Sequence, residues 1–226
     1  MLRKPRVIFF DVGNTLLFPN HDIILAPLRT RAEAPSQELW HSIERRTKPQ
    51  FDAEMQSGHA DHSFWYLFYC NLLDEMGLHD DALRDQLVAA TRVSANWGKP
   101  RAETRAYIDR IKEHYRIGVI SNSDGKIPEL LTANGIFDCF ESVIDSGNIG
   151  YEKPHPAIFE AALRDMKAAP EESLYVGDMY SIDYQGATRA GMQAMLFDVS
   201  GAYRDLGVPR VDSLKALDRQ LRDQFS

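Results

Sequence analysis

The sequence predicts an α/β fold in which a doubly wound parallel sheet is interrupted by an inserted bundle of helices. Three observations carry this prediction. Five short apolar runs alternate with amphipathic stretches, residues 20–97 lack a convincing β-branched run, and polar side chains directly follow several of the five runs. Apolar runs separated by helices favour parallel strands that are buried on both faces and joined by right-handed crossovers.

The first predicted strand covers residues 7–10, with the sequence VIFF, and leads into Asp11 and then a Gly13-Asn14-Thr15 turn. In open α/β sheets, ligands bind beyond the carboxyl ends of the strands. A glycine at such a place lets backbone groups come close to a ligand. Asp11 is therefore a candidate nucleophile or metal ligand.

The segment after this strand is predicted to be helical. Apolar and aromatic residues recur there at helix-like spacing, around Trp40 and again over 64–76, and a further helix is expected over 80–93. A structureless loop of this length is improbable in a compact domain. We therefore predict a core of residues 1–18 and 98–226 and a helical cap of residues 19–97, with hinges near 16–20 and 97–100.

Strands and helices alternate after the insert. Further strands are predicted over 116–120, 140–144, 173–176 and 194–197. Helices are predicted over 101–115, 127–134 and 156–166, after residue 183 to about residue 190, and around Leu214, Leu217 and Leu221. The carboxyl ends of parallel strands meet at one edge of a sheet. Side chains that follow these strands are therefore expected to converge.

The polar groups expected at that edge are Asp11, Ser121 with Asn122, Lys153, and Asp178 with Asp183. A single carboxylate or lysine is usually a solvated surface residue. Four such groups in order, each after a strand or in a loop at the same edge, indicate a functional site.

Composition narrows the classes of function. The chain has 44% hydrophobic residues, a formal net charge of −7 and a pI near 5.5, which fit a globular protein and argue against nucleic-acid binding. No apolar run approaches the roughly 20 residues of a membrane span. Residues 1–5 show no signal-peptide core, so we expect a cytoplasmic protein, monomeric or homodimeric, with Cys70 and Cys139 as reduced thiols.

The order of these groups resembles the haloacid dehalogenase-like (HAD) superfamily. Asp11-Val12-Gly13-Asn14-Thr15 is similar to its first motif, Ile120-Ser121-Asn122 to the second, Lys153-Pro154 to the third, and Gly177-Asp178 with Asp183 to the fourth. The resemblance spans essentially the whole chain, and the insert has the position and size of the family's helical C1 cap. It implies a hydrolase with a Rossmann-like catalytic core.

The resemblance also implies a nucleophile and a metal ion. Asp11 would form a covalent aspartyl-phosphate, with Mg²⁺ bound alongside. The implied ligands are Asp11, the backbone carbonyl of Gly13, Asp178 and, directly or through water, Asp183; oxygen ligands of this kind suit Mg²⁺. The implied activity is the Mg²⁺-dependent hydrolysis of a small phosphorylated metabolite.

The remaining implied roles concern the phosphoryl group. A phosphate ester repels an anionic nucleophile, so nearby positive charge is needed, and the metal ion and Lys153 would supply it. Lys153 would bridge Asp11 and the phosphoryl group, and Ser121 and Asn122 would hydrogen-bond its oxygens. Thr15 belongs with these phosphate-binding residues because it is expected to orient the loop.

One position departs from the family pattern. Many phosphatases of this family carry a second Asp two residues after the nucleophile, where it protonates the leaving group, and here that residue is Gly13. Positioned acid–base groups contribute roughly 10²–10⁴-fold to rate. We therefore expect a slow phosphatase, or one that favours good leaving groups, unless His21, His41 or His62 of the cap replaces the missing acid.

Two other functions stay open at this stage. A 2-haloacid dehalogenase would use Asp11 without a metal, and Arg45 or Arg46 would then have to hold the halide. A catalytically degenerate member would bind a ligand or partner through its cap, where Phe51 and Trp65 would suit a binding surface. A phosphonatase-like reaction needs a cap lysine, for which Lys48 is a poor match in sequence.

Overall fold

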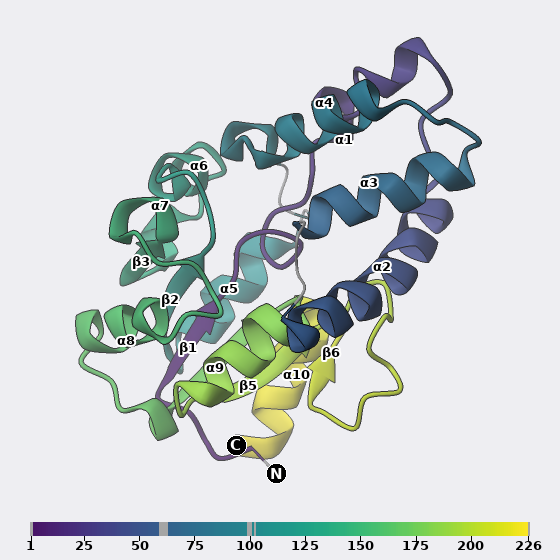
Figure 1. The fold of residues 1–226 in the computed structure, drawn as a ribbon. Coiled ribbons are helices and arrows are strands. Elements are labelled where there is room, and N and C mark those ends of the chain that lie inside the picture. The colour runs from purple at the N-terminus through teal and green to yellow at the C-terminus, as the bar shows by residue number, and fades with distance from the viewer. Residues whose placement is uncertain (1, 59–62, 99–100, 102, 226) are drawn as a thin grey trace.

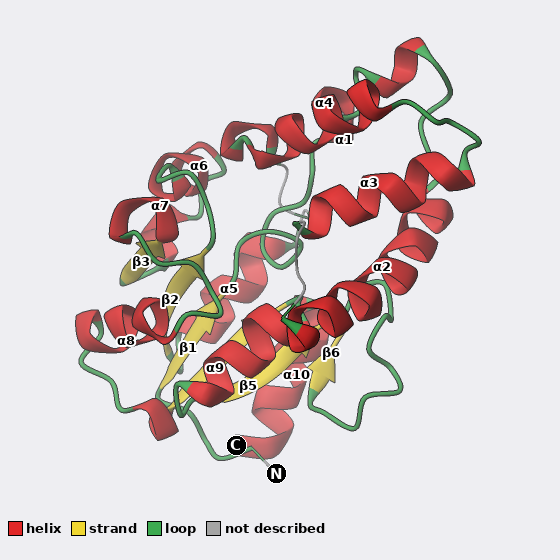
Figure 2. Ribbon diagram, viewed as in Figure 1, coloured by secondary structure: helices red, strands yellow, loops and turns green. Residues whose placement is uncertain are grey.

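The computed structural model describes residues 2–58, 63–98, 101 and 103–225, and it confirms the α/β prediction. Six parallel strands form one sheet in the order β3-β2-β1-β4-β5-β6 (Figures 1 and 2). The strands are β1 (Val7–Phe10), β2 (Arg116–Ser121), β3 (Ser142–Asp145), β4 (Ser173–Gly177), β5 (Gln193–Phe197) and β6 (Arg210–Val211). The sequence predicts only the first five, because a two-residue strand leaves no recognisable apolar run.

The centre of the sheet positions the predicted site. β1 is fully buried and pairs in parallel with β2 on one side and β4 on the other. Phe10 lies opposite Val119 and Val176, and the amide of Asp11 donates to the carbonyl oxygen of Val176 at 2.9 Å. This register brings Asp11 level with the end of β4, which precedes Asp178.

Helices cover both faces of the sheet, as a doubly wound fold requires. They are α5 (Thr104–Lys112), α6 (Ile127–Ala133), α7 (Ser146–Ile149), α8 (Pro156–Asp165), α9 (Gln185–Arg189) and α10 (Leu214–Phe225), and a π-helix spans Tyr180–Tyr184. Apolar residues of α5, α6 and α10 form one buried cluster with the strands, and those of α8 and α9 form another. Figure 1 shows α8 and α9 on one side of the sheet and α5 and α10 on the other.

The insert after β1 is helical, as predicted. It contains α1 (His21–Ile24), α2 (Gln37–Ser57), α3 (Phe64–Glu75) and α4 (Asp81–Arg92), with short 3₁₀-helices at Leu28–Thr30 and Ser94–Asn96. Two more 3₁₀-helices lie later in the chain, at Phe137–Cys139 and Pro170–Glu172. Ser36 and Asp80 cap α2 and α4 with their side chains. These helices bury an apolar cluster that includes Trp40, Phe51 and Phe68 and that also takes in Met179 from the loop after β4. The aromatic residues are therefore largely core residues, and Phe51 is not the surface residue that a docking cap would need.

The two segments that join the insert to the sheet run side by side. Pro19 and Trp97 form an antiparallel bridge, Asn20 N donates to Asn96 O at 3.0 Å, and Gly98 N donates to Phe18 O at 3.2 Å. These contacts lie at the predicted hinges, of which Lys99 and Pro100 fall outside the described residues. The division into core and cap stays a prediction.

Candidate active site at the carboxyl edge of the sheet

Asp11 and Lys153 form the centre of the site. Lys153 Nζ lies 2.6 Å from Asp11 Oδ1, and both side chains are buried, with exposed fractions of 3% and 10%. Asn122 holds the backbone of Lys153 from both sides: its Nδ2 donates to Lys153 O at 3.0 Å, and its Oδ1 accepts from Lys153 N at 2.7 Å. The side chain of Asn122 therefore positions Lys153. The predicted contact with a phosphoryl oxygen is left to the backbone amide of Asn122.

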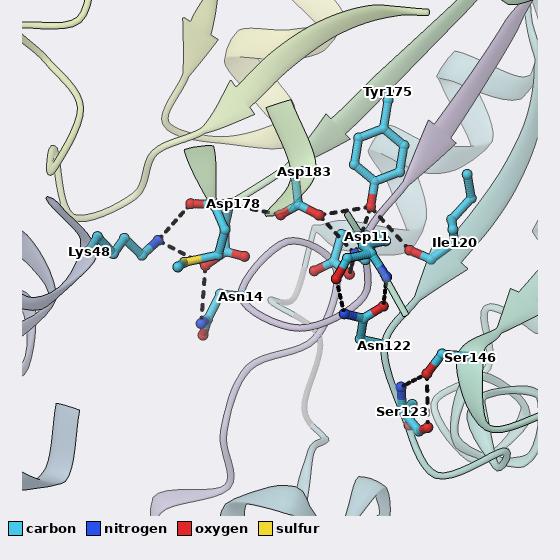
Figure 3. Close-up of polar contacts among 12 residues, drawn as sticks. Asp11, Asn14, Lys48, Ile120, Asn122, Ser123, Ser146, Tyr175, Asp178 and Asp183 are labelled. Carbon is cyan, nitrogen blue, oxygen red and sulfur yellow. Dashed lines mark hydrogen bonds and ion pairs between the residues drawn. The ribbon is translucent and has the colours of Figure 1, made fainter. Parts of the chain in front are cut away.

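Every hydrogen of the Lys153 ammonium group has an acceptor. Besides Asp11, Nζ donates to Asp183 Oδ1 and to the Tyr175 hydroxyl, both at 2.8 Å. The Tyr175 hydroxyl in turn donates to the carbonyl oxygen of Ile120 at 3.1 Å. Figure 3 draws this contact. An ammonium group has three donors. In this state Lys153 neutralises two carboxylates, and it must release one partner before it can hydrogen-bond a phosphoryl oxygen.

Asp11, Asp178 and Asp183 form a buried cluster of carboxylates. One oxygen from each lies within 4.8 Å of the others. Burial raises the pKa of Asp11 to about 7, against the lowering effect of Lys153, and the charges of Asp183 and Asp178 raise it further. Burial also raises the pKa of Asp178. A divalent cation with hard oxygen ligands would relieve this repulsion, so these residues fit Mg²⁺.

The loop after β4 brings Asp183 back to the end of that strand. Asp183 Oδ2 accepts from Met179 N at 2.9 Å, while Oδ1 contacts Lys153 and Tyr175. Both oxygens of Asp183 are thus engaged by protein donors, which favours contact with a metal ion through water. A Cβ atom at Gly177 would lie 2.5 Å from Asp183 Cγ, so this close approach requires glycine.

This packing makes Gly177→Ala a damaging substitution. The added methyl group must push Asp183 away from Lys153, so we expect hydrolytic activity to fall at least about 10-fold, or 1.4 kcal/mol in the activation free energy. Steady-state kinetics of the purified variant would measure this fall. Gly207→Ala is the matched control, because a Cβ at Gly207 meets no atom within 4 Å. Equal activity of both variants would contradict the tight packing.

An aromatic ring lies beside Gly13, the position that departs from the family pattern. A Cβ at Gly13 would lie 3.2 Å from Cζ3 of Trp97, whose indole Nε1 donates to the carbonyl oxygen of Thr91 at 2.7 Å. This bond anchors Trp97. A longer side chain at position 13 would therefore have to displace the ring.

The other predicted site residues lie at the same edge. Ser121 is buried and ends β2, and Ile120 before it accepts a hydrogen bond from Tyr175. Thr15 is 1% exposed, and its hydroxyl has no hydrogen-bond partner among the described residues. Gly13 forms a bridge with Leu17 in the turn after β1.

Three residues at the site were not assigned a role from the sequence. Lys48 of α2 donates to Asp178 Oδ2 at 2.8 Å and to Asp178 O at 2.9 Å, and Asn14 Nδ2 reaches Asp178 Oδ2 at 3.3 Å (Figure 3). Tyr175 is the third. A tyrosine in a buried strand needs a partner for its hydroxyl. That rule is the signal in the sequence for Tyr175. The spacing of Glu44, Lys48 and Asp52 along one helix face is the signal for Lys48.

The histidines and arginines of the insert that were named as candidates have other contacts or lie outside the described residues. His21 packs against Trp40, with ring centroids 4.3 Å apart, and burial lowers the pKa of both His21 and His41. His62 is outside the described residues. Arg46 donates to Glu75 and to the carbonyl oxygen of Asn71 on α3, and Arg45 donates to Glu38 and to Ser200 O. None of these hydrogen bonds joins either arginine to Asp11, Asp178 or Asp183, which gives the halide-binding role no support.

Glu44, on the face of α2 that carries Lys48, supplies a pH-dependent term in stability. Burial raises its pKa to about 7, against the lowering effect of Lys48. Because the folded state holds this proton more tightly than the unfolded state, the free energy of unfolding falls as pH rises from about 4.5 to 7. A difference of this size corresponds to about 3 kcal/mol.

Glu44→Gln removes that term because the amide does not ionise. We expect the change in the free energy of unfolding that the substitution causes to be more favourable at pH 8 than at pH 4.5, by up to about 3 kcal/mol. Denaturant unfolding at the two pH values measures the difference. Glu38→Gln, at a carboxylate whose side chain is 80% exposed, is the control. An identical pH dependence of the Glu44→Gln variant and the original protein would contradict the prediction.

The family follows from the sequence match. A family model described as haloacid dehalogenase-like hydrolase matches residues 5–191, so the chain belongs to that family of hydrolases. This confirms the resemblance seen in the four motifs. In the described part of the chain, no helix is long and apolar enough to cross a membrane.

Curated relatives include phosphatases and proteins named only by their domain. A glyceraldehyde 3-phosphate phosphatase of Methanothermobacter thermautotrophicus is 44% identical over 105 residues, which are 45% of this chain and 46% of that protein. The match thus spans less than half of that relative. A protein of the same name from Methanopyrus kandleri is 29% identical over 92% of this chain and 89% of its own. Haloacid dehalogenase-like hydrolase domain-containing protein 3 of Bos taurus is 26% identical over 84% and 81%.

Solved structures share the fold. A putative HAD-hydrolase from Bacillus subtilis, described as bound to magnesium, has a TM-score of 0.67 at 16% identity and covers 97% of this chain and 99% of its own. A 2-haloacid dehalogenase from Pseudomonas syringae has a TM-score of 0.60 at 22% identity and covers 98% and 100%. At these identities the likeness concerns the fold alone.

Proposed function

We propose that this protein is a Mg²⁺-dependent phosphatase that acts on a small phosphate monoester through an aspartyl-phosphate on Asp11. The observation that carries the proposal is the buried cluster of three carboxylates, which Lys153 bridges between Asp11 and Asp183. The names of the archaeal relatives support a phosphate ester as the substrate. Glyceraldehyde 3-phosphate is therefore one compound to assay.

In the proposed first step, the Asp11 oxygen that is not bound to Lys153 attacks the phosphorus atom. The bond from phosphorus to the leaving-group oxygen breaks, and the alkoxide leaves with that electron pair and takes up a proton. Water then attacks the phosphorus of the aspartyl-phosphate, which releases inorganic phosphate and restores the Asp11 carboxylate. Lys153 holds Asp11 in position and offsets its charge through the 2.6 Å contact.

The metal ion would be held by Asp11, Asp178 and the Gly13 carbonyl, with Asp183 through water. When bound, it would supply positive charge that offsets the charge of the phosphoryl oxygens. Lys153 would exchange one of its present acceptors for a phosphoryl oxygen, and Ser121 with the Asn122 amide would bind the others. Thr15, which is buried in the turn after β1, would orient the loop beside them.

Glycine at position 13 is expected to make the rate depend strongly on the leaving group. Because Trp97 fills the place of a side chain there, the departing oxygen lacks the usual acid. We expect kcat/KM for p-nitrophenyl phosphate and acetyl phosphate to exceed that for glyceraldehyde 3-phosphate by about 10² or more, which is the usual contribution of such a group. Equal values for all three substrates would show that another residue of the cap supplies the proton.

The same assays, run with and without Mg²⁺, test the proposed function itself. Metal-dependent release of phosphate supports it. Release of chloride from 2-chloropropionate without metal would replace it by dehalogenation, and the absence of both activities at high enzyme concentration would favour a binding protein.

We also propose that residues 19–97 move as a cap relative to a core of residues 1–18 and 98–226. Of the described residues buried in the cluster around Trp40, the insert supplies all but one, and its two connections to the sheet pair with each other. Closure would exclude water while the aspartyl-phosphate forms, and opening would admit water for hydrolysis. Identical cap positions in free and ligand-bound crystals would contradict this.

A further inference from the structure

One face of α2 contacts the loop that carries Asp178 and Asp183 through polar side chains. Lys48 Nζ contacts both the carboxylate and the carbonyl oxygen of Asp178, and one helical turn later Asp52 Oδ1 accepts from Ser181 N at 2.9 Å. Lys48 is 2% exposed and Asp52 is 5% exposed. The contact between α2 and this loop is therefore built from buried polar groups, which have little access to water as an alternative hydrogen-bond partner.

Lys48 uses the same carboxylate that the proposed metal ion requires. Asp178 Oδ2 accepts from Lys48 at 2.8 Å and from Asn14 at 3.3 Å. A carboxylate oxygen has about two lone-pair positions, so Oδ2 has no position left for a metal ion in this arrangement. A divalent ion on the other oxygen would still lie near the Lys48 ammonium, and the two cations would repel each other in a buried environment.

We propose that Lys48 is a resident counter-ion that competes with the divalent ion for Asp178, so that metal binding and the docking of α2 weaken each other. This inference rests on the Mg²⁺ site of the proposed function. The coupling is reciprocal by thermodynamic linkage: whatever loosens the Lys48 contact tightens the binding of the ion, and the ion loosens the contact. Lys48 is then a positioning residue that links α2 to the occupancy of the site.

Calorimetric titration of the full chain with Mg²⁺, in the absence of substrate, tests this coupling without an activity readout. Lys48→Met keeps a long side chain and removes the charge, and we expect it to bind Mg²⁺ at least tenfold more tightly than the original protein. Arg46→Met is the matched control, since it removes a cation from the same helix that contacts Glu75 and Asn71 rather than the loop. Its affinity for Mg²⁺ should equal that of the original protein.

A second variant loosens the other end of the contact without touching Asp178. Asp52→Asn weakens the bond to Ser181, and we expect Mg²⁺ to bind at least threefold more tightly, which keeps the test valid if Lys48→Met does not fold. Hydrogen exchange adds a direct readout: amides of α2 around Lys48 should exchange faster when Mg²⁺ is present. Slower exchange there would overturn the proposal.

The outcomes separate this inference from the function on which it rests. Unchanged or weaker Mg²⁺ binding by the Lys48→Met and Asp52→Asn variants, beside normal binding by the original protein, overturns the competition and leaves the phosphatase proposal intact. It would mean that Lys48 orients Asp178 for the ion instead. Failure of the original protein and of all three variants to bind Mg²⁺ overturns both.

Discussion

Asp11→Asn is expected to lower phosphatase activity by at least about 10³-fold, because the amide cannot act as the attacking carboxylate. The same change should make the metal-free protein more stable at pH 8. Burial holds the pKa of Asp11 near 7, so above that pH the folded state contains a carboxylate that its surroundings disfavour. An amide of the same shape removes that cost.

The two effects of Asp11→Asn have separate measurements. Steady-state kinetics with p-nitrophenyl phosphate and Mg²⁺ gives the loss of activity, and the melting temperature at pH 8 with a chelator present gives the change in stability. Loss of activity together with a higher melting temperature identifies a carboxylate kept for chemistry rather than for folding. An active variant would exclude Asp11 as the nucleophile.

Lys153→Met is expected to damage both activity and stability. The ammonium group is the shared partner of Asp11, Asp183 and Tyr175, and its side chain is only 3% exposed. Removing one partner of a buried ion pair leaves a charge without compensation and typically costs about 3–5 kcal/mol. We expect at least about a 10²-fold loss of kcat, because Asp11 loses the group that holds it.

The stability effect of Lys153→Met also depends on pH in a defined direction. Without Lys153 the pKa of Asp11 rises further, because the contact with the ammonium group now lowers it. Protonation at low pH would relieve the unpaired carboxylate, so the loss of stability should be larger at pH 8 than at pH 5. Denaturant unfolding at both values measures it, with Lys215→Met, at an exposed lysine of α10, as the control. A loss independent of pH would contradict the pairing.

The sheet and the convergence of the main polar groups were predictable from the sequence because both depend on local patterns. Buried parallel strands show continuous apolar runs, and side chains that follow them must meet at one edge. Asp11, Lys153, Asp178 and Asp183 do lie together in the structure. Their catalytic roles stay proposals.

The residues that the sequence did not assign act through contacts between distant segments. Lys48 lies on a helix whose charged face would ordinarily meet solvent, and only the packing of α2 on the loop after β4 makes that face part of the site. Trp97 closes the space beside Gly13 from the far end of the insert. Neither contact follows from hydrophobic periodicity, which describes one element at a time.

The proposed phosphatase reaction depends on the capture of the phosphoryl group by Asp11. The most direct test is to mix the enzyme with acetyl phosphate and Mg²⁺, quench with acid within the first turnovers, and map the modified peptide by mass spectrometry. We predict a phosphoryl group on Asp11 of the original protein. Steady turnover with the phosphoryl group on another residue, or with Asp11 unmodified at every time sampled, would contradict it.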